Sequence, residues 1–89
     1  MKGHPLRALM NRLKWTEEDL SRFTIRYIHR GAPGDTREVD LSMVAKIGKG
    51  WFEIRGEEGS PIPFHRVLEV ADSSTGMILW RRGGRQRIP

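Results

Sequence analysis

The chain contains no cysteine. This absence excludes disulfide bonds, thiolate metal sites and thiol-based catalysis. Small secreted domains usually depend on disulfides, so the composition favours an intracellular protein, which we expect in the cytoplasm.

Long apolar segments are missing as well. The longest uninterrupted run extends only from Met77 to Trp80, whereas a transmembrane helix needs about 20 apolar residues. No apolar stretch follows the N-terminal residues Met1 to Pro5, so no signal peptide is predicted. The sequence therefore gives no reason to expect a membrane as a partner.

Metal ligands are scarce. The three histidines are not spaced at i, i+4, and no Glu-x-x-His pattern occurs, so neither a metal nor another cofactor is predicted. The glycines of Gly48-Lys49-Gly50 precede a strand-like segment rather than a helix. Without a helix N-terminus to face a phosphate, this segment is typical of a hairpin turn and not of a nucleotide-binding loop.

Acidic residues are absent from the last nine positions, which hold four of the 16 Lys and Arg residues. The net charge of +5 therefore arises largely there, since positions 1–80 contain 12 basic and 11 acidic residues. A basic tail is a common nucleic-acid contact because each cation replaces a counterion on the phosphate chain, although it equally fits a solubilising tail. Arg outnumbers Lys by 12 to 4, which favours nucleic acid because guanidinium groups fork onto phosphate and stack on bases.

The 89 residues are enough for one domain. Apolar residues recur at helical spacing over 5–14, which predicts an amphipathic helix with its apolar stripe on the core. That stripe consists of Leu6, Leu9, Met10 and Leu13. Thr16 is predicted to cap a short helical turn over 16–20.

Alternation of apolar and polar residues predicts strands over 22–29 and 51–55. Residues 61–70 and 77–80 are predicted as two further strands, which form a meander with 51–55. Residues 37–41 fit a further strand, or Asp40 caps a helix over 41–47 that buries Met43. The predicted fold is α+β, with one antiparallel sheet of four to five strands and the N-terminal helix packed on one face. Residues 1–82 form this domain, and residues 83–89 are predicted to be a basic, disordered tail.

Two histidines are each followed directly by arginine near a strand end, as His29-Arg30 and His65-Arg66. Two imidazoles can act as base and acid in RNA phosphodiester chemistry while a cation holds the phosphate. The same pairs can hold a phosphate without reacting, or be inert. Spacing alone favours inert residues over catalysis.

Four aromatic residues lie in the predicted strands and can include a base-stacking platform. They are Tyr27, Trp51, Phe64 and Trp80. A domain with only seven aromatics also needs several of them in its core, and strand parity does not tell which face is solvated.

Three segments resemble the motifs of one family. The run from Phe23 to Asp35 resembles a Tyr-x-x-Arg-Gly segment, Ile62-Pro-Phe-His-Arg66 resembles an Ile-Pro-x-His-Arg motif, and Ile78-Leu-Trp-Arg81 resembles a closing Val-x-Trp-x-Arg segment. Together they resemble the RNA cyclic group end recognition domain, a family of small, mainly archaeal proteins. The similarity covers about residues 8–82, and the Ile-Pro-x-His-Arg motif is its most specific element.

The resemblance implies an α+β domain that recognises RNA ends bearing a 2′,3′-cyclic phosphate and that assists RNA-end-processing enzymes. Matched position by position, it implies that Tyr27, Arg30, His65, Arg66 and Trp80 bind the RNA and its phosphate. Many relatives have Asp at the position of His29, so the resemblance does not extend to that residue.

We therefore predict a non-catalytic domain that binds RNA at 3′ ends, with Arg81 and the following arginines as a sequence-independent clamp. One alternative is a small ribonuclease or cyclic-phosphate hydrolase that uses His65, with or without His29. The paired His-x-Thr/Ser motifs of the two-histidine phosphodiesterases are absent. Another alternative is a protein-interaction module, which requires an exposed apolar patch. The oligomeric state and the identity of any partner enzyme stay open.

Overall fold

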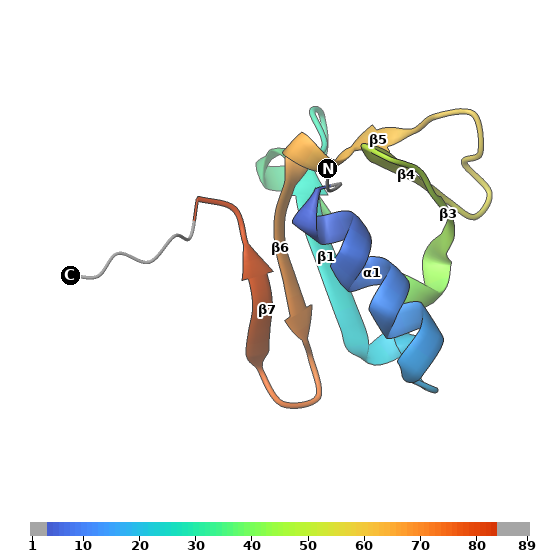
Figure 1. The fold of residues 1–89 in the computed structure, drawn as a ribbon. Helices are drawn as coiled ribbons and strands as arrows, with labels where there is room; N and C mark the ends of the chain where they lie inside the picture. The colour runs from blue at the N-terminus through green and yellow to red at the C-terminus, as the bar shows by residue number, and fades with distance from the viewer. Residues whose placement is uncertain (1–3, 84–89) are drawn as a thin grey trace.

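The structure is a computed structural model that describes residues 4–83. Within this range one α-helix is followed by seven strands joined by short turns (Figure 1). The helix is α1 (Pro5–Thr16), and the strands are β1 (Phe23–Ile28), β2 (Thr36–Asp40), β3 (Val44–Ile47), β4 (Trp51–Ile54), β5 (Ile62–Pro63), β6 (Val67–Asp72) and β7 (Met77–Arg81). This arrangement confirms the predicted α+β class with an N-terminal helix.

The strands form two antiparallel sheets rather than one. The larger sheet has the order β2-β1-β6-β7 and the smaller has the order β3-β4-β5. The meander predicted over 51–81 is right in its two antiparallel pairs, β4 with β5 and β6 with β7, but wrong as one continuous sheet. β4 also pairs with β3 in the smaller sheet, and β6 also pairs with β1 in the larger one. Alternation along a segment identifies a strand but not its partner, and β1 and β6 are far apart in the sequence.

The N-terminal helix forms as its apolar stripe predicts. Leu6, Met10 and Leu13 are buried, and the helix extends beyond the predicted end at residue 14 to Thr16. His4 caps the helix, since its Nδ1 accepts a hydrogen bond of 3.0 Å from the N–H of Leu6.

Thr16 does not cap the turn that follows α1. It lies in the last turn of the helix and donates its hydroxyl to the carbonyl of Arg12 at 2.9 Å. The next helical turn, Leu20–Arg22, is capped instead by Asp19, whose carboxylate accepts from the N–H of Ser21 at 3.1 Å.

Asp40 caps only a single turn. Its carboxylate accepts from the N–H of Ser42 at 2.9 Å over the 3-10 turn Leu41–Met43, and β3 follows directly. The helix predicted over 41–47 is therefore wrong, and β2 bears out the strand alternative. The turn buries Leu41 and leaves Met43 39% exposed.

The strand predicted over 61–70 is interrupted by the 3-10 turn Phe64–Arg66, which separates β5 from β6. Ile62, Phe64 and Val67 are all buried. These residues are spaced first by two and then by three positions, and one straight strand cannot place all three on the same face. The 3-10 turn allows all three side chains to point into the core. It also connects β5 in the smaller sheet to β6 in the larger one.

One hydrophobic core joins α1 to both sheets. The ring of Phe52 lies at its centre, 6.2 Å from the stacked ring of Phe64 and 6.0 Å from the edge-on ring of Tyr27, measured between centroids. Within the described range, no helix is long and apolar enough to cross a membrane. Residues 84–89 lie outside that range, so the disordered tail and the boundary at residue 82 stay predictions.

Candidate nucleic-acid interface

Strand register brings the two His-Arg pairs to one end of the larger sheet. Tyr27 on β1 pairs with Val67 on the antiparallel β6, so the residues after β1 run beside those before β6. Arg30 follows β1, and His65 and Arg66 directly precede β6. Because β7 is antiparallel to β6, it also ends here (Figure 1). We name this the basic end and define it by the exposed residues Arg30, His65, Arg66, Arg81 and Arg82.

The two residues that follow the buried Phe64 are exposed. Phe64 is 1% exposed, and its N–H donates to the carbonyl of Gly50 at 2.9 Å. Val67 fixes the other end of the turn, since it is buried and its N–H donates to the carbonyl of Phe64. His65 and Arg66 lie between these two anchors and are exposed. The Ile-Pro-x-His-Arg segment therefore builds a turn that presents an imidazole and a guanidinium to solvent.

Three arginines of the basic end have no acidic partner between residues 4 and 83. Arg30, Arg66 and Arg82 are exposed and form no ion pair in that range. Arg81 differs, because its Nη2 lies 3.4 Å from Oε1 of Glu69. Unpaired guanidinium groups keep all their N–H donors for an incoming anion. The basic end thus holds three guanidinium groups that form no ion pair within residues 4–83, although the exposed Asp35 lies in the same loop as Arg30.

Trp80 lies on the opposite face of β7 from Arg81. It pairs with the buried Val70, which directs the indole toward the α1 side of the sheet. The indole is half-buried, and its centroid is 6.1 Å from the imidazole of His4. Trp80 therefore lies beside the N-terminus of α1, at the margin of the basic end, with part of its ring accessible.

Tyr27 does not offer its ring to a base. It is 1% exposed and shares the buried face of β1 with Phe23 and Ile25, so the stacking role suggested by the motif needs correction. Burial raises the pKa of its hydroxyl above the ordinary value. Within residues 4–83 this buried hydroxyl forms no hydrogen bond of good geometry, although the nearby guanidinium of Arg37 lowers its pKa.

Arg37, which lies beside Tyr27, was not among the binding residues predicted from the sequence. Arg37 on β2 pairs directly with Tyr27 across the sheet. Its Nη1 and Nη2 donate to Oε1 and Oε2 of Glu57 at 3.1 and 2.6 Å, and this hydrogen bonding lowers the pKa of Glu57. Glu57 lies in the turn after β4. No local pattern signals the pair, because it joins two segments that meet only in the folded chain.

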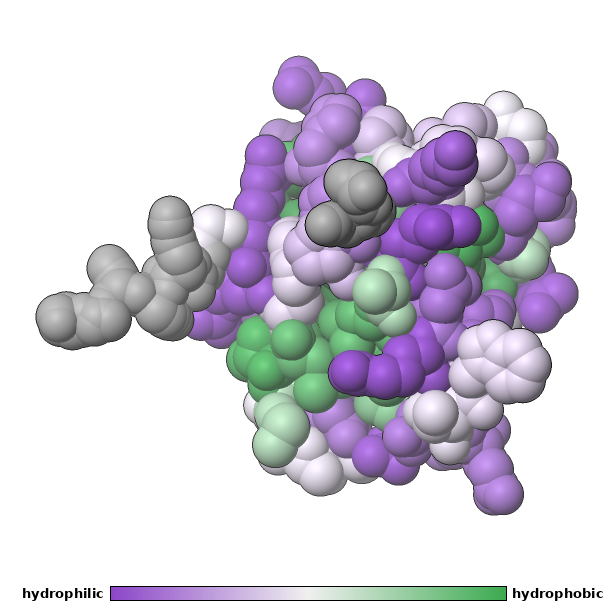
Figure 2. All heavy atoms as spheres, viewed as in Figure 1, coloured by the Kyte–Doolittle hydropathy of each residue, from purple (hydrophilic) through white to green (hydrophobic). Residues whose placement is uncertain are grey.

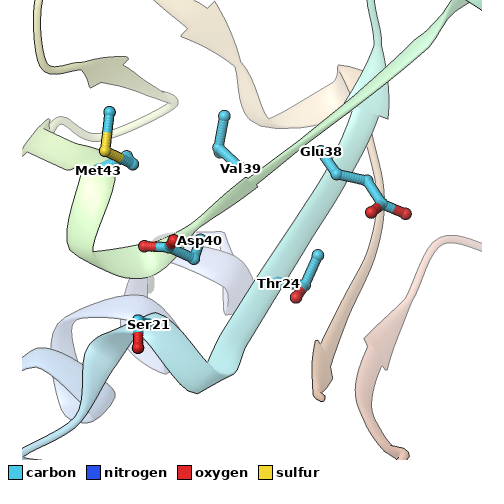
Figure 3. Close-up of a pocket in the computed structure, with 6 residues that line it drawn as sticks. All are labelled: Ser21, Thr24, Glu38, Val39, Asp40 and Met43. Atoms are coloured by element: carbon cyan, nitrogen blue, oxygen red, sulfur yellow. The ribbon is translucent and has the colours of Figure 1, made fainter.

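A shallow pocket lies elsewhere on the larger sheet. Its lining residues are Ser21, Thr24, Glu38, Val39, Asp40 and Met43 (Figure 3). None of the predicted binding residues lines it. Two of its side chains are carboxylates, which repel phosphate, and the carboxylate of Asp40 is already bound to Ser42. This pocket is therefore a poor phosphate site. Among the described residues, no group of three His, Asp or Glu could hold a metal ion.

The fold and the basic end define a small α+β domain with an exposed, arginine-rich edge. The MJ1316 RNA cyclic group end recognition domain matches residues 1–82, and the chain belongs to this family. This confirms the resemblance found in the sequence motifs.

Several archaeal UPF0248 proteins are similar to the chain over most of its length. The UPF0248 protein of Methanococcus vannielii is 35% identical over 78 residues, which cover 86% of this chain and 90% of that protein. The UPF0248 protein of Pyrobaculum islandicum is 32% identical over 82 residues, which cover 91% of this chain and 94% of that protein. No solved structure matches the chain.

Proposed function

We propose that the chain binds RNA and recognises 3′ ends that carry a 2′,3′-cyclic phosphate, without catalysing a reaction. The observation that carries this proposal is the basic end, where Arg30, Arg66 and Arg82 have no acidic partner among residues 4–83 and His65 is exposed beside them. The description of the family supports the choice of ligand.

The chemistry of the cyclic phosphate suits these groups. It carries one negative charge and two free oxygens, and a forked guanidinium can donate to both oxygens at once. We assign this role to Arg66, with Arg30 as a second cation and an N–H of His65 as a further donor. A terminal nucleotide is unstacked, so a shallow site on a small domain can reach it.

The accessible part of Trp80 is our candidate for contact with the terminal base. Base–aromatic stacking needs one exposed ring face and tolerates any base. Arg81 and the basic residues that follow supply contacts to the phosphate chain that carry no sequence information. A domain that binds RNA ends without catalysing a reaction needs a partner that acts on them. We propose an RNA-end-processing enzyme as that partner.

The test compares one short RNA prepared with a 2′,3′-cyclic phosphate, a 3′-phosphate or a 3′-hydroxyl end. Binding is measured at two salt concentrations, and the RNA is checked afterwards for cleavage. We expect tighter binding to the cyclic end and intact RNA. Equal binding to all three ends would overturn end recognition. A cleaved product would instead favour the alternative of an enzyme that uses His65 as acid or base.

Replacement of Arg66 by alanine tests the assignment of the site. A hydrogen bond to a charged group contributes about 1.5–3 kcal/mol, so Arg66→Ala should weaken binding to the cyclic end by roughly tenfold or more. Arg12→Ala is the matched control, because Arg12 is an exposed arginine on α1 outside the basic end. Equal affinities of the two variants would remove Arg66 from the site.

A further inference from the structure

The hydroxyl of Tyr27 is one of two buried side-chain polar atoms without a hydrogen bond of good geometry among residues 4–83, the other being Nε of Arg7. Its oxygen is shielded from solvent. An unpaired buried donor destabilises the fold, and such groups call for an explanation in terms of strain, catalysis or a missing ligand. The aromatic ring alone would fill the same space in the core, so the hydroxyl is not needed for packing.

A guanidinium and an imidazole lie next to Tyr27. Arg37 is its direct neighbour across β1 and β2, and the charge and weak hydrogen bonding of Arg37 lower the pKa of Tyr27 against the larger effect of burial. The imidazole of His29 meets the Tyr27 ring edge-on, with 6.2 Å between centroids. The side chain of Tyr27 therefore has a guanidinium and an imidazole as neighbours.

The carboxylate of Glu57 is bound to the guanidinium of Arg37. Both oxygens of Glu57 accept hydrogen bonds from the guanidinium of Arg37, at 3.1 and 2.6 Å. This is the two-pronged geometry in which arginine also binds phosphate. The side chain of Glu57 is 41% exposed and that of Arg37 is 34% exposed, so an anion from solvent can compete for the guanidinium.

We propose that Tyr27 and Arg37, with His29 at the rim, form a second phosphate-binding subsite that the Glu57 carboxylate occupies in the free protein. The ligand is an internal phosphodiester of the RNA strand, which displaces Glu57 and accepts hydrogen bonds from Arg37 and from the hydroxyl of Tyr27. This inference rests on the proposed function, since it takes RNA to be the ligand.

The position of the subsite fits one strand of RNA that also reaches the basic end. Arg30 lies three residues after Tyr27, in the turn that follows β1, so their Cα atoms are separated by at most roughly 10 Å. Glu57 belongs to the turn between β4 and β5, where two backbone hydrogen bonds hold it. Its N–H donates to the carbonyl of Ile54 at 2.9 Å, and its carbonyl accepts from the N–H of Ser60 at 3.2 Å. Displacement of its side chain does not require the core to move.

The first test removes the competing charge and uses a hexamer of RNA with a 3′-hydroxyl end as the probe. Glu57→Gln keeps the shape of the side chain but weakens its hold on Arg37. Exposed ion pairs contribute about 0.2–1 kcal/mol, so this variant should bind the hexamer on the order of threefold more tightly than the wild type. Glu58→Gln is the matched control, since Glu58 is the exposed neighbour and forms no ion pair with any residue in 4–83.

The second test removes only the hydroxyl. Tyr27→Phe should bind the hexamer about tenfold more weakly, as expected for the loss of one hydrogen bond to a charged acceptor. The same variant should be at least as resistant to urea as the wild type, because an unpaired buried hydroxyl is lost. A purely structural tyrosine would leave RNA affinity unchanged.

The subsite is overturned if Glu57→Gln and Glu58→Gln bind the hexamer equally, or if Tyr27→Phe keeps the affinity of the wild type. These outcomes are separate from the failure of end recognition, which is read from the ratio of affinities for cyclic and hydroxyl ends in the wild type. A protein without end preference whose Glu57→Gln variant still gains affinity would retain the subsite and lose the proposed end site.

Discussion

Asp72 is the one charged residue that the core buries among the described residues, at 6% exposed. Its Oδ2 accepts from Nη2 of Arg22 at 2.8 Å, and its Oδ1 accepts from the N–H of Ser74 at 3.0 Å. The hydrogen bond from Arg22 is the main cause that holds the pKa of Asp72 well below its usual range. A carboxylate with a depressed pKa in the folded state stabilises the fold above its pKa in the unfolded chain.

Asp72→Asn should therefore lower the free energy of unfolding at pH 7. The difference from the wild type should shrink as the pH falls below about 4, where the unfolded chain takes up the proton. Urea denaturation at both pH values measures this. Glu18→Gln is the control, since Glu18 is exposed. A deficit in Asp72→Asn that is the same at pH 7 and in acid would show that packing, and not the ion pair, stabilises this position.

Individual residues also show how much of the candidate site the sequence could predict. The exposed positions of Arg30, His65 and Arg66 agree with the predicted binding residues, although their role in binding RNA stays a prediction. Tyr27 could not be assigned to a face, because the alternation of β1 groups residues by side without telling which side the core covers. The pairing of Arg37 with Glu57 could not be predicted, because it depends on how the two sheets meet.

At the scale of the elements, the hairpin between β3 and β4 gives the sharpest prediction. The N–H of Gly48 donates to the carbonyl of Trp51 at 2.8 Å, and a Cβ at Gly48 would overlap the indole of Trp51. Gly48→Ala should displace this ring and lower the free energy of unfolding by about 1 kcal/mol or more, as expected for overpacking. Urea denaturation followed by tryptophan fluorescence measures both effects.

Gly50→Ala is the matched control in the same turn, because a Cβ at Gly50 meets nothing within 4 Å. We expect this variant to keep the fluorescence and stability of the wild type to within a few tenths of a kcal/mol. Comparable losses in both variants would mean that the turn requires glycine for backbone freedom and that contact with Trp51 is not the reason.

The elements also show where pattern reading fails. The spacing of Leu6, Met10 and Leu13 predicted α1, and alternation predicted β1, because each of these segments keeps one period throughout. The segment 61–70 changes phase at Phe64, and the segment 41–47 turns once and then becomes β3. Local periodicity cannot predict such changes, because they depend on which side chains are buried in the folded chain.

Across the whole molecule, the two ends of the larger sheet differ in charge. Glu17, Asp19 and Asp72 lie at the end where β1 begins and β6 finishes, and Arg22 is bound there to Glu17 and Asp72. The unpaired arginines lie at the opposite, basic end. Figure 2 shows apolar surface gathered over β6 and β7, and β7 carries the exposed Met77 and Ile78. If the chain binds RNA as proposed, we expect the strand to approach the molecule from the basic end.

The basic end continues along the chain into residues 84–89, which include Arg85 and Arg87. Removal of these six residues should reduce the slope of log affinity against log salt by about 1.4, since each contact with single-stranded phosphate contributes roughly 0.7. The ratio of affinities for cyclic and hydroxyl ends should stay the same, because contacts to the phosphate chain do not distinguish one end from another. Titrations of both RNAs at four salt concentrations measure slope and ratio together.

A truncated chain that keeps the full slope would show that the arginines of the folded domain make all the phosphate contacts. A truncated chain that loses its preference for the cyclic end would place end recognition in the tail and remove it from Arg66 and His65.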